Sequence, residues 1–427
     1  MSKCSSILHS SKVRDFAKLL SANIVAQVIG LLIYPIVTRL YAPEDFGLMN
    51  LFISIANVIV IIATAEFQYA VVLPKEDKKA VSVMHVGLFC LSLVTFLVTL
   101  SIFCRKQIAM LFNTPALSDM YVLLPIMVFV LGAWNLLNYW YIRNKMYTSI
   151  STYQIGQSTL SAATKLGCGY TGLLQVGLIY SVVFAPLLSL FTSIAFSFRK
   201  CLRPLLHVDK RDMLDVAKTY RNFPVFTLPR SLLNTLAGQL PVLLLTPIFG
   251  IELIGYWSMA SLLGFVPINM ITKAIYQVLY QHVTEKVNHN QPIVAMLKHF
   301  VIICLVVAIP LFAILYFVLP ALVSWLLGDV WYVCGEYIRW MLPWLLLSLL
   351  TASTCFLSDV FFQQKKGLFF EILLAICRLA GLVVGVIVKD FTVAIAAYSI
   401  GSAIAIAAQF VWLMTLAKKY ETKLLNS

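Results

Sequence analysis

Apolar stretches of membrane-spanning length recur along this chain and are separated by short polar connections. A helix crosses the hydrocarbon of a bilayer with about 20 apolar residues, and the pattern predicts twelve such segments. They lie at residues 17–38, 47–72, 80–104, 119–142, 150–171, 173–197, 223–248, 254–281, 293–319, 336–361, 368–388 and 390–417. The first segment is too long for a signal peptide and lacks an A-x-A cleavage site, so we interpret it as a retained helix.

The composition agrees with this pattern. The 427 residues are 61% hydrophobic and 12% charged, and the mean hydropathy is +0.90. Soluble domains are about 45–50% apolar and about 25% charged. Because this chain has too few polar groups to cover a surface exposed to water, lipid must be its solvent. We therefore predict an all-α integral membrane protein with no sizeable soluble domain.

Lysine and arginine are distributed unequally between the two sides of the predicted bundle. Of the 32, 23 lie in the termini and every second loop, 4 lie in the opposite loops, and 5 lie inside the spans. Because the richer side faces the cytoplasm, both termini are predicted to be cytoplasmic and the number of helices must be even. This topology accounts for the net charge of +14, so no nucleic-acid partner is predicted.

The longest polar loop divides the predicted helices into two groups of six. The predicted organisation is an N-terminal lobe at 1–197, a basic cytoplasmic linker at 198–222, and a C-terminal lobe with a short tail at 223–427. Pro35 lies near the end of the first predicted helix, and Pro241 lies at the equivalent place near the end of the seventh. Secondary transporters are built from such repeated halves, so we predict two pseudo-symmetric lobes around a central cavity.

Four predicted helices, the first two of each lobe, each carry one polar face. Their polar residues recur at steps of three or four, which places them on one side of a helix. The residues that we assign to a shared aqueous cavity are Asn23, Gln27, Asn57, Gln68, Asn234, Asn269 and Gln277. Hydrogen bonding between helices is the alternative explanation of each face, at about 0.6 kcal/mol per contact.

Charged side chains inside the spans are costly, at about 2.5–3.5 kcal/mol each near the centre. We predict that Arg230, Lys273 and Arg378 form a cationic site in the C-terminal lobe, open to the cytoplasm and suited to phosphate. Glu66 is assigned to coupling or gating, either by pairing with one of these cations or by carrying a proton. Lys165 lies at a different depth from Glu66 and is not predicted to pair with it. Purely structural pairing of the charges is the alternative.

The sequence has no motif that indicates an enzyme or a metal site. It contains no GxxxxGK[ST], HExxH or GxSxG pattern, and its histidines and nine cysteines show no ligand spacing. We therefore predict no catalytic residues, no metal and no cofactor. A membrane-embedded polymerase or ligase is the enzymatic alternative, disfavoured because the outer loops are short; the largest are 105–118 and 320–335.

Several short segments, in order along the chain, carry a resemblance to a known family. They are PEDFG at 43–47, VLPK at 72–75, NYW at 138–140, YRNFP at 220–224, FG at 249–250 and GY at 255–256. With these segments the chain resembles the bacterial polysaccharide-export flippases (the O-antigen, or Wzx-type, translocases). They belong to the multidrug/oligosaccharidyl-lipid/polysaccharide (MOP) superfamily. The resemblance spans nearly the whole chain.

The resemblance implies a substrate class and a location. The substrate would be an undecaprenyl-pyrophosphate-linked oligosaccharide, an O-antigen or other polysaccharide repeat unit, moved between the leaflets of the bacterial inner membrane. A polysaccharide polymerase and a chain-length regulator are the implied partners. The family has no fixed motif of functional residues, so the cationic site is inferred from this chain alone. A cation-coupled drug or metabolite antiporter is the alternative, disfavoured because cations outnumber acids within the spans by five to three.

Overall fold

The computed structural model describes residues 25–206, 210–361 and 363–425, and all regular elements in these ranges are helical. Ten helices within them are long and apolar enough to cross a membrane. α10 (Tyr147–Tyr170) is of similar length but rich in Ser, Thr and Gln, and Val25–Leu40 is a shorter apolar helix. The predicted all-α, multi-pass architecture is confirmed, and these twelve segments are consistent with the predicted number.

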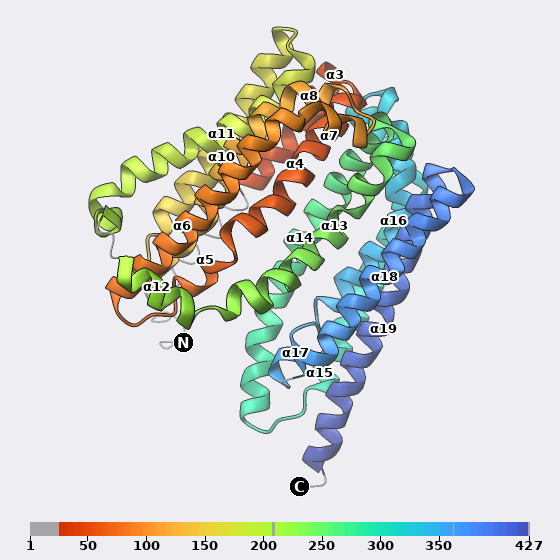
Figure 1. Cartoon of the computed structure of the whole chain (residues 1–427). Coiled ribbons are helices and arrows are strands. Elements are labelled where there is room, and N and C mark those ends of the chain that lie inside the picture. Colours follow the sequence, from red (N-terminus) through yellow and green to blue (C-terminus); the bar gives the residue numbers. More distant parts are fainter. Residues whose placement is uncertain (1–24, 207–209, 362, 426–427) are drawn as a thin grey trace. The chain divides into compact units, whose positions relative to one another are not determined.

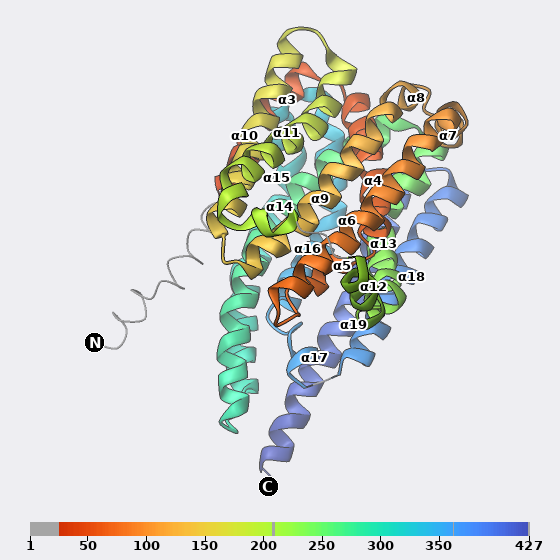
Figure 2. The ribbon, with the colours of Figure 1, turned by 60° about the vertical axis from the view of Figure 1, so that its left-hand side comes forward.

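The contacts divide the chain into two compact units, and the first ends at Glu252. Besides α10, its helices are α3 (Tyr34–Leu40), α4 (Pro43–Thr64), α5 (Phe67–Ala70), α6 (Asp77–Leu100), α7 (Arg105–Leu111), α8 (Ala116–Met120), α9 (Leu124–Arg143), α11 (Leu174–Ser197), α12 (Lys210–Thr219) and α13 (Leu228–Phe249). α4 packs against α6, α9, α11 and α13, and α10 and α11 form a hairpin (Figures 1 and 2). α4 is thus the central helix of this unit.

The second unit begins at Leu253, in the first turn of α14. Its helices are α14 (Ile251–Asn288), α15 (Val294–Leu327), α16 (Tyr332–Thr351), α17 (Leu357–Val360), α18 (Gln364–Val388) and α19 (Phe391–Leu425). α18 and α19 form a closely packed hairpin, and α16 packs against α15 and α19 (Figure 1). The unit therefore holds α16 between two partners, which fixes the wall that α16 contributes to the site described below.

The boundary between the units falls after α13, whereas the sequence analysis placed the boundary between lobes at 198–222, before it. The reason is that α13 packs against α4 of the first unit. The predicted linker itself contains a basic helix, α12, which packs against α6; Lys78 Nζ lies 2.8 Å from Asp212 Oδ2. The grouping of six and six helices into lobes stays a prediction.

The structure breaks two helices that the sequence analysis predicted as continuous. The segment predicted at 47–72 ends its first helix at Thr64, because Ala65 and Glu66 have φ values of +45° and +60°. The segment predicted at 336–361 ends at Thr351 and resumes at Leu357 as the short α17. The prediction of a continuous helix was therefore wrong at both places. Neither place has the Gly or Pro that usually marks a break.

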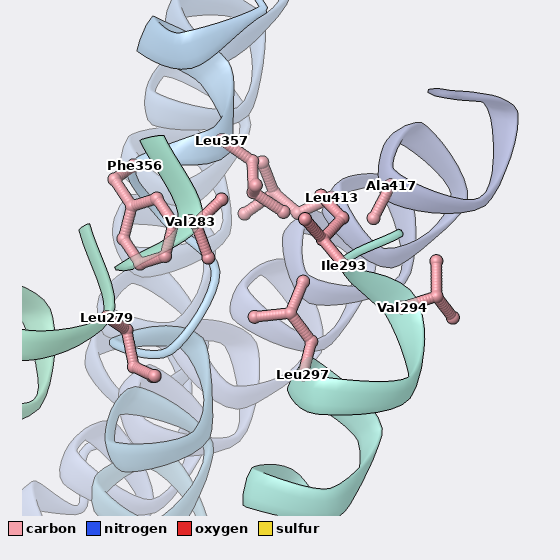
Figure 3. Close-up of a cluster of buried hydrophobic side chains, with 9 residues drawn as sticks. All are labelled: Leu279, Val283, Ile293, Val294, Leu297, Phe356, Leu357, Leu413 and Ala417. Atoms are coloured by element: carbon pink, nitrogen blue, oxygen red, sulfur yellow. The ribbon is translucent and has the colours of Figure 1, made fainter. Parts of the chain in front are cut away.

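A compact apolar cluster joins four segments of the second unit (Figure 3). Its buried members come from the C-terminal part of α14, the start of α15, the start of α17 with the residue before it, and α19. They are Leu279, Val283, Ile293, Val294, Leu297, Phe356, Leu357, Leu413 and Ala417. Phe356 also meets the rings of Tyr276 and Tyr280 at centroid distances of 5.8 and 5.7 Å. The cluster thereby fixes the C-terminal end of α14.

The hairpin of α18 and α19 depends on glycines that let the two backbones approach. A Cβ added at Gly385 would overlap the backbone of Ala394, whereas a Cβ at Gly238 in α13 would meet nothing within 4 Å. We expect Gly385→Ala to destabilise the protein by about 1–3 kcal/mol through overpacking, measured as a lower unfolding temperature in detergent. Gly238→Ala is the control and should unfold at or above the wild-type temperature; equal behaviour of the two variants would contradict this packing argument.

Candidate functional site

A cavity of about 550 Å³ lies inside the second unit, between α14, α16, α18 and α19. Two of its lining residues are cations predicted from the sequence, Lys273 on α14 and Arg378 on α18. The other polar lining residues are Asn269, Thr272, Tyr276, Ser348, Thr351 and Gln409. No carboxylate is among the described residues that line it. The cavity therefore combines net positive charge with hydrogen-bonding groups.

Arg378 is held in place by aromatic rings and a hydroxyl. Its guanidinium carbon lies 5.0 Å from the ring centre of Trp344 and 5.5 Å from that of Tyr398. Its Nε donates a hydrogen bond to Ser402 Oγ at 3.2 Å, and Ser402 Oγ donates to the Tyr398 carbonyl at 2.8 Å. Its two terminal nitrogens make no hydrogen bond to any described residue. The fork that matches a phosphate remains available to a ligand.

The aromatic support of Arg378 is itself fixed by packing. The rings of Trp344 and Tyr398 meet edge to face at 5.5 Å, Phe265 contacts Trp344 at 4.6 Å, and Trp257 contacts Tyr398 at 5.8 Å. Tyr398 is only 2% exposed. A cation over a ring is stabilised by about 0.5–2 kcal/mol without any charge neutralisation. The rings therefore orient the guanidinium while leaving its full positive charge to attract an anion.

Lys273 is an exposed residue on the α14 wall of the same cavity. No described residue forms a salt bridge or hydrogen bond with its ammonium group. Asn269 lies one turn earlier on α14 and lines the cavity too, as the polar face of this helix predicted. Two cations without a carboxylate partner on the walls of one cavity both attract an anion that enters it. The arrangement is suited to binding a phosphorylated group.

Glu66 lies at the break after α4 and is only 2% exposed. Gln68 Nε2 donates a hydrogen bond to Glu66 Oε2, and Ser231 on α13 also hydrogen-bonds the carboxyl group. Gln68, which the sequence analysis assigned to a cavity, is thus buried as the partner of this acid. The carboxyl group links the break to α13, the helix that carries Arg230.

The remaining predicted residues lie in several places. Arg230 and Asn234 are exposed on α13 of the first unit, and Asn57 is half-buried on α4. The structure thus brings Lys273 and Arg378 to one cavity and places Arg230 in the other unit. Two predictions fall outside the described residues: Asn23 entirely, and the side chain of Gln277 on α14.

Gln27, the last of the predicted cavity residues, lines a second and smaller polar pocket in the first unit. This pocket has a volume of about 280 Å³ and lies between the helix at Val25–Leu40 and α10. Lys165 was noted from the sequence as a charge inside a span, but the polar face of α10, which also carries Gln154 and Ser158, was missed. The same spacing of three or four residues that marked the other polar faces is present on α10, so the pattern was sufficient to find it.

Comparison with known proteins identifies a family for this chain and solved structures that share its fold. Residues 36–336 match the family model described as polysaccharide biosynthesis protein. The lipid II flippase MurJ, in an inward closed conformation, has a TM-score of 0.72 at 12% identity, covering 95% of this chain and 90% of that one.

Two further solved structures have the same fold. An inward-facing multidrug resistance MATE family transporter of the MOP superfamily has a TM-score of 0.70 at 15% identity, covering 95% of each chain. A MOP superfamily transporter from Pyrococcus furiosus has a TM-score of 0.54 at 14% identity, covering 96% of each chain. No curated protein matches the chain. At these identities the structures establish the fold alone.

Proposed function

Because the chain belongs to the polysaccharide biosynthesis protein family, we propose that it is a flippase for an undecaprenyl-pyrophosphate-linked oligosaccharide. The substrate would be a repeat unit of O-antigen or another surface polysaccharide, moved from the inner to the outer leaflet of the bacterial inner membrane, with both termini of the protein in the cytoplasm. The observation that carries the proposal is the cavity lined by Lys273 and Arg378 and, among the described residues, by no carboxylate. A pyrophosphate needs such cations when it leaves water.

In this proposal each named group has one task. Arg378 binds the pyrophosphate through its free terminal nitrogens, and Lys273 adds a point charge. Asn269, on the same wall as Lys273, supports hydrogen bonding to the head group. Alternating access would expose the loaded site first to the inner and then to the outer side. The released repeat unit would then be available to a polysaccharide polymerase and its chain-length regulator.

The test is the leaflet distribution of undecaprenyl-pyrophosphate-linked glycan in cells that lack this protein. We expect the glycan to accumulate on the cytoplasmic face, and the wild-type gene to reverse the accumulation. An Arg378→Gln variant, expressed at the same level, should fail to reverse it. Normal glycan export combined with increased sensitivity to small cationic drugs would reject the proposal and favour a drug antiporter.

A further inference from the structure

The small pocket of the first unit has the chemistry of a sugar-binding site. Five of its ten lining residues carry a side-chain amide or hydroxyl group: Gln27, Gln154, Gln157, Ser158 and Ser161. Amides and hydroxyls both donate and accept hydrogen bonds, which is what neighbouring hydroxyls of a sugar ring require. The volume of about 280 Å³ is near the lower end of the range for ligand pockets, about 300–1,000 Å³. It therefore suits a single sugar residue.

Lys165 gives this pocket a buried positive charge. The residue is only 8% exposed, and its ammonium nitrogen lies 3.5 Å from the Tyr34 hydroxyl and 5.1 Å from the centre of that ring. No carboxylate lines the pocket among the described residues, and none of them forms a salt bridge with Lys165. A buried charge is normally paired. A phenol at 3.5 Å is a weak partner, so the site as described lacks an anion.

A second observation also indicates a missing ligand. The side-chain oxygen of Gln154 is buried and has no hydrogen-bond partner among the described residues. A buried acceptor left unsatisfied costs about 1–3 kcal/mol. Because Gln154 lines the same pocket as Lys165, rotation of its amide group would turn this oxygen toward a ligand hydroxyl, beside the anionic group that Lys165 would bind.

The walls of the pocket are fixed by direct hydrogen bonds between its two helices. Ser158 Oγ donates to the Ala26 carbonyl at 2.6 Å, and Tyr41 Oη donates to the Lys165 carbonyl at 2.7 Å. The helices can approach closely because Gly169 has no side chain; a Cβ at this position would crowd Leu40 and Tyr41. The pocket is therefore preorganised, and binding would not have to order its walls.

The geometry points to this pocket as a subsite for an acidic sugar, with Lys165 contacting a carboxylate and the amides contacting ring hydroxyls. The inference rests on the proposed function, since the sugar would be part of the lipid-linked glycan. It deepens that function by naming a feature of the glycan: a negatively charged residue, as in a uronic acid. The subsite is separate from the pyrophosphate cavity, which lies wholly within the second unit.

The experiment measures binding of methyl glucuronide and methyl glucoside to the full chain in nanodiscs by saturation-transfer NMR titration. The two probes differ only in a carboxylate or a hydroxymethyl group at one carbon. We expect the wild type to bind the glucuronide about tenfold more tightly, the effect of one charge-assisted hydrogen bond. Lys165→Gln should lose this preference, and Lys165→Arg should keep it. Lys106→Gln, which removes an exposed cation, is the control and should behave as the wild type.

A second variant keeps the test decisive if Lys165→Gln fails to fold. Ser161→Asp would place a carboxylate one helical turn before Lys165, where the two can pair, and should abolish the preference without removing the lysine. Three results would overturn the inference: equal binding of the two probes by the wild type, a preference that survives in Lys165→Gln, or displacement of the glucuronide by inorganic phosphate with no binding of the glucoside. None of these depends on transport, so a failed leaflet assay would reject the flippase and leave the sugar preference measurable.

Discussion

Arg378→Gln is expected to lower glycan flipping by about 10- to 100-fold, measured as the rate at which a lipid-linked glycan crosses the bilayer of proteoliposomes. The substitution removes the charge that the cavity presents to a pyrophosphate, and a hydrogen bond to a charged group contributes about 1.5–3 kcal/mol. Lys273→Gln should have an effect of the same kind. Expression and unfolding temperature should change little, because among the described residues the guanidinium donates a hydrogen bond to Ser402 alone.

Arg378→Lys separates the charge from the shape of the group. The lysine keeps a positive charge but loses the planar fork and the stacking on Trp344 and Tyr398. We expect an activity between those of the wild type and Arg378→Gln. If the lysine variant were fully active, charge alone would suffice, and the fork geometry would have no role in recognition.

The matched control for Arg378 is Arg339 in the same unit. Its guanidinium also lies over a ring, 5.0 Å from the centre of Tyr316. However, its Nη1 is 3.1 Å from Glu336 Oε1, and the residue does not line the cavity. Arg339→Gln should therefore transport at nearly the wild-type rate. Equal losses in Arg339→Gln and Arg378→Gln would indicate a general structural role of arginine and would refute the pyrophosphate site.

The two cations of the cavity could be predicted because charge inside an apolar span is rare and costly. Lys273 and Arg378 are 105 positions apart in the sequence, yet each is conspicuous in its own segment. Their aromatic support was not predictable in the same way. Trp344 and Tyr398 lie in apolar segments, where an aromatic residue is expected whether it supports an arginine or only fills space, and the sequence pattern does not distinguish the two.

The break at Ala65 and Glu66 could not be predicted for a different reason. Neither residue is a glycine, and positive φ values are unfavourable for both. The carboxyl group of Glu66 is stabilised there by Gln68, two residues on, and by Ser231, on a helix more than 160 residues away in the sequence. The local bond to Gln68 and the long-range bond to Ser231 together override the preference for a continuous helix, and only the folded chain brings Ser231 to this carboxyl group.

Glu66→Gln is expected to abolish stimulation of transport by a pH gradient while leaving substrate binding intact. The carboxyl group is buried, and it is hydrogen-bonded to an amide and a hydroxyl at the point where the helix breaks. We propose that it carries the coupling proton, since protonation would change its bonds to Gln68 and to Ser231 on α13. Glutamine has nearly the same shape but cannot titrate, so the structural role would survive and the coupling would not.

The measurement is the rate of glycan flipping in proteoliposomes with and without an imposed pH gradient. Wild-type transport should be accelerated by the gradient, and the Glu66→Gln rate should be the same in both conditions. Glu76→Gln is the control, because Glu76 is an exposed acid paired with Lys79 at 3.0 Å; this variant should keep the full response. If Glu66→Gln also kept the response, the proton would be carried elsewhere, and the buried carboxyl group would serve only to hold the break between α4 and α5 against α13.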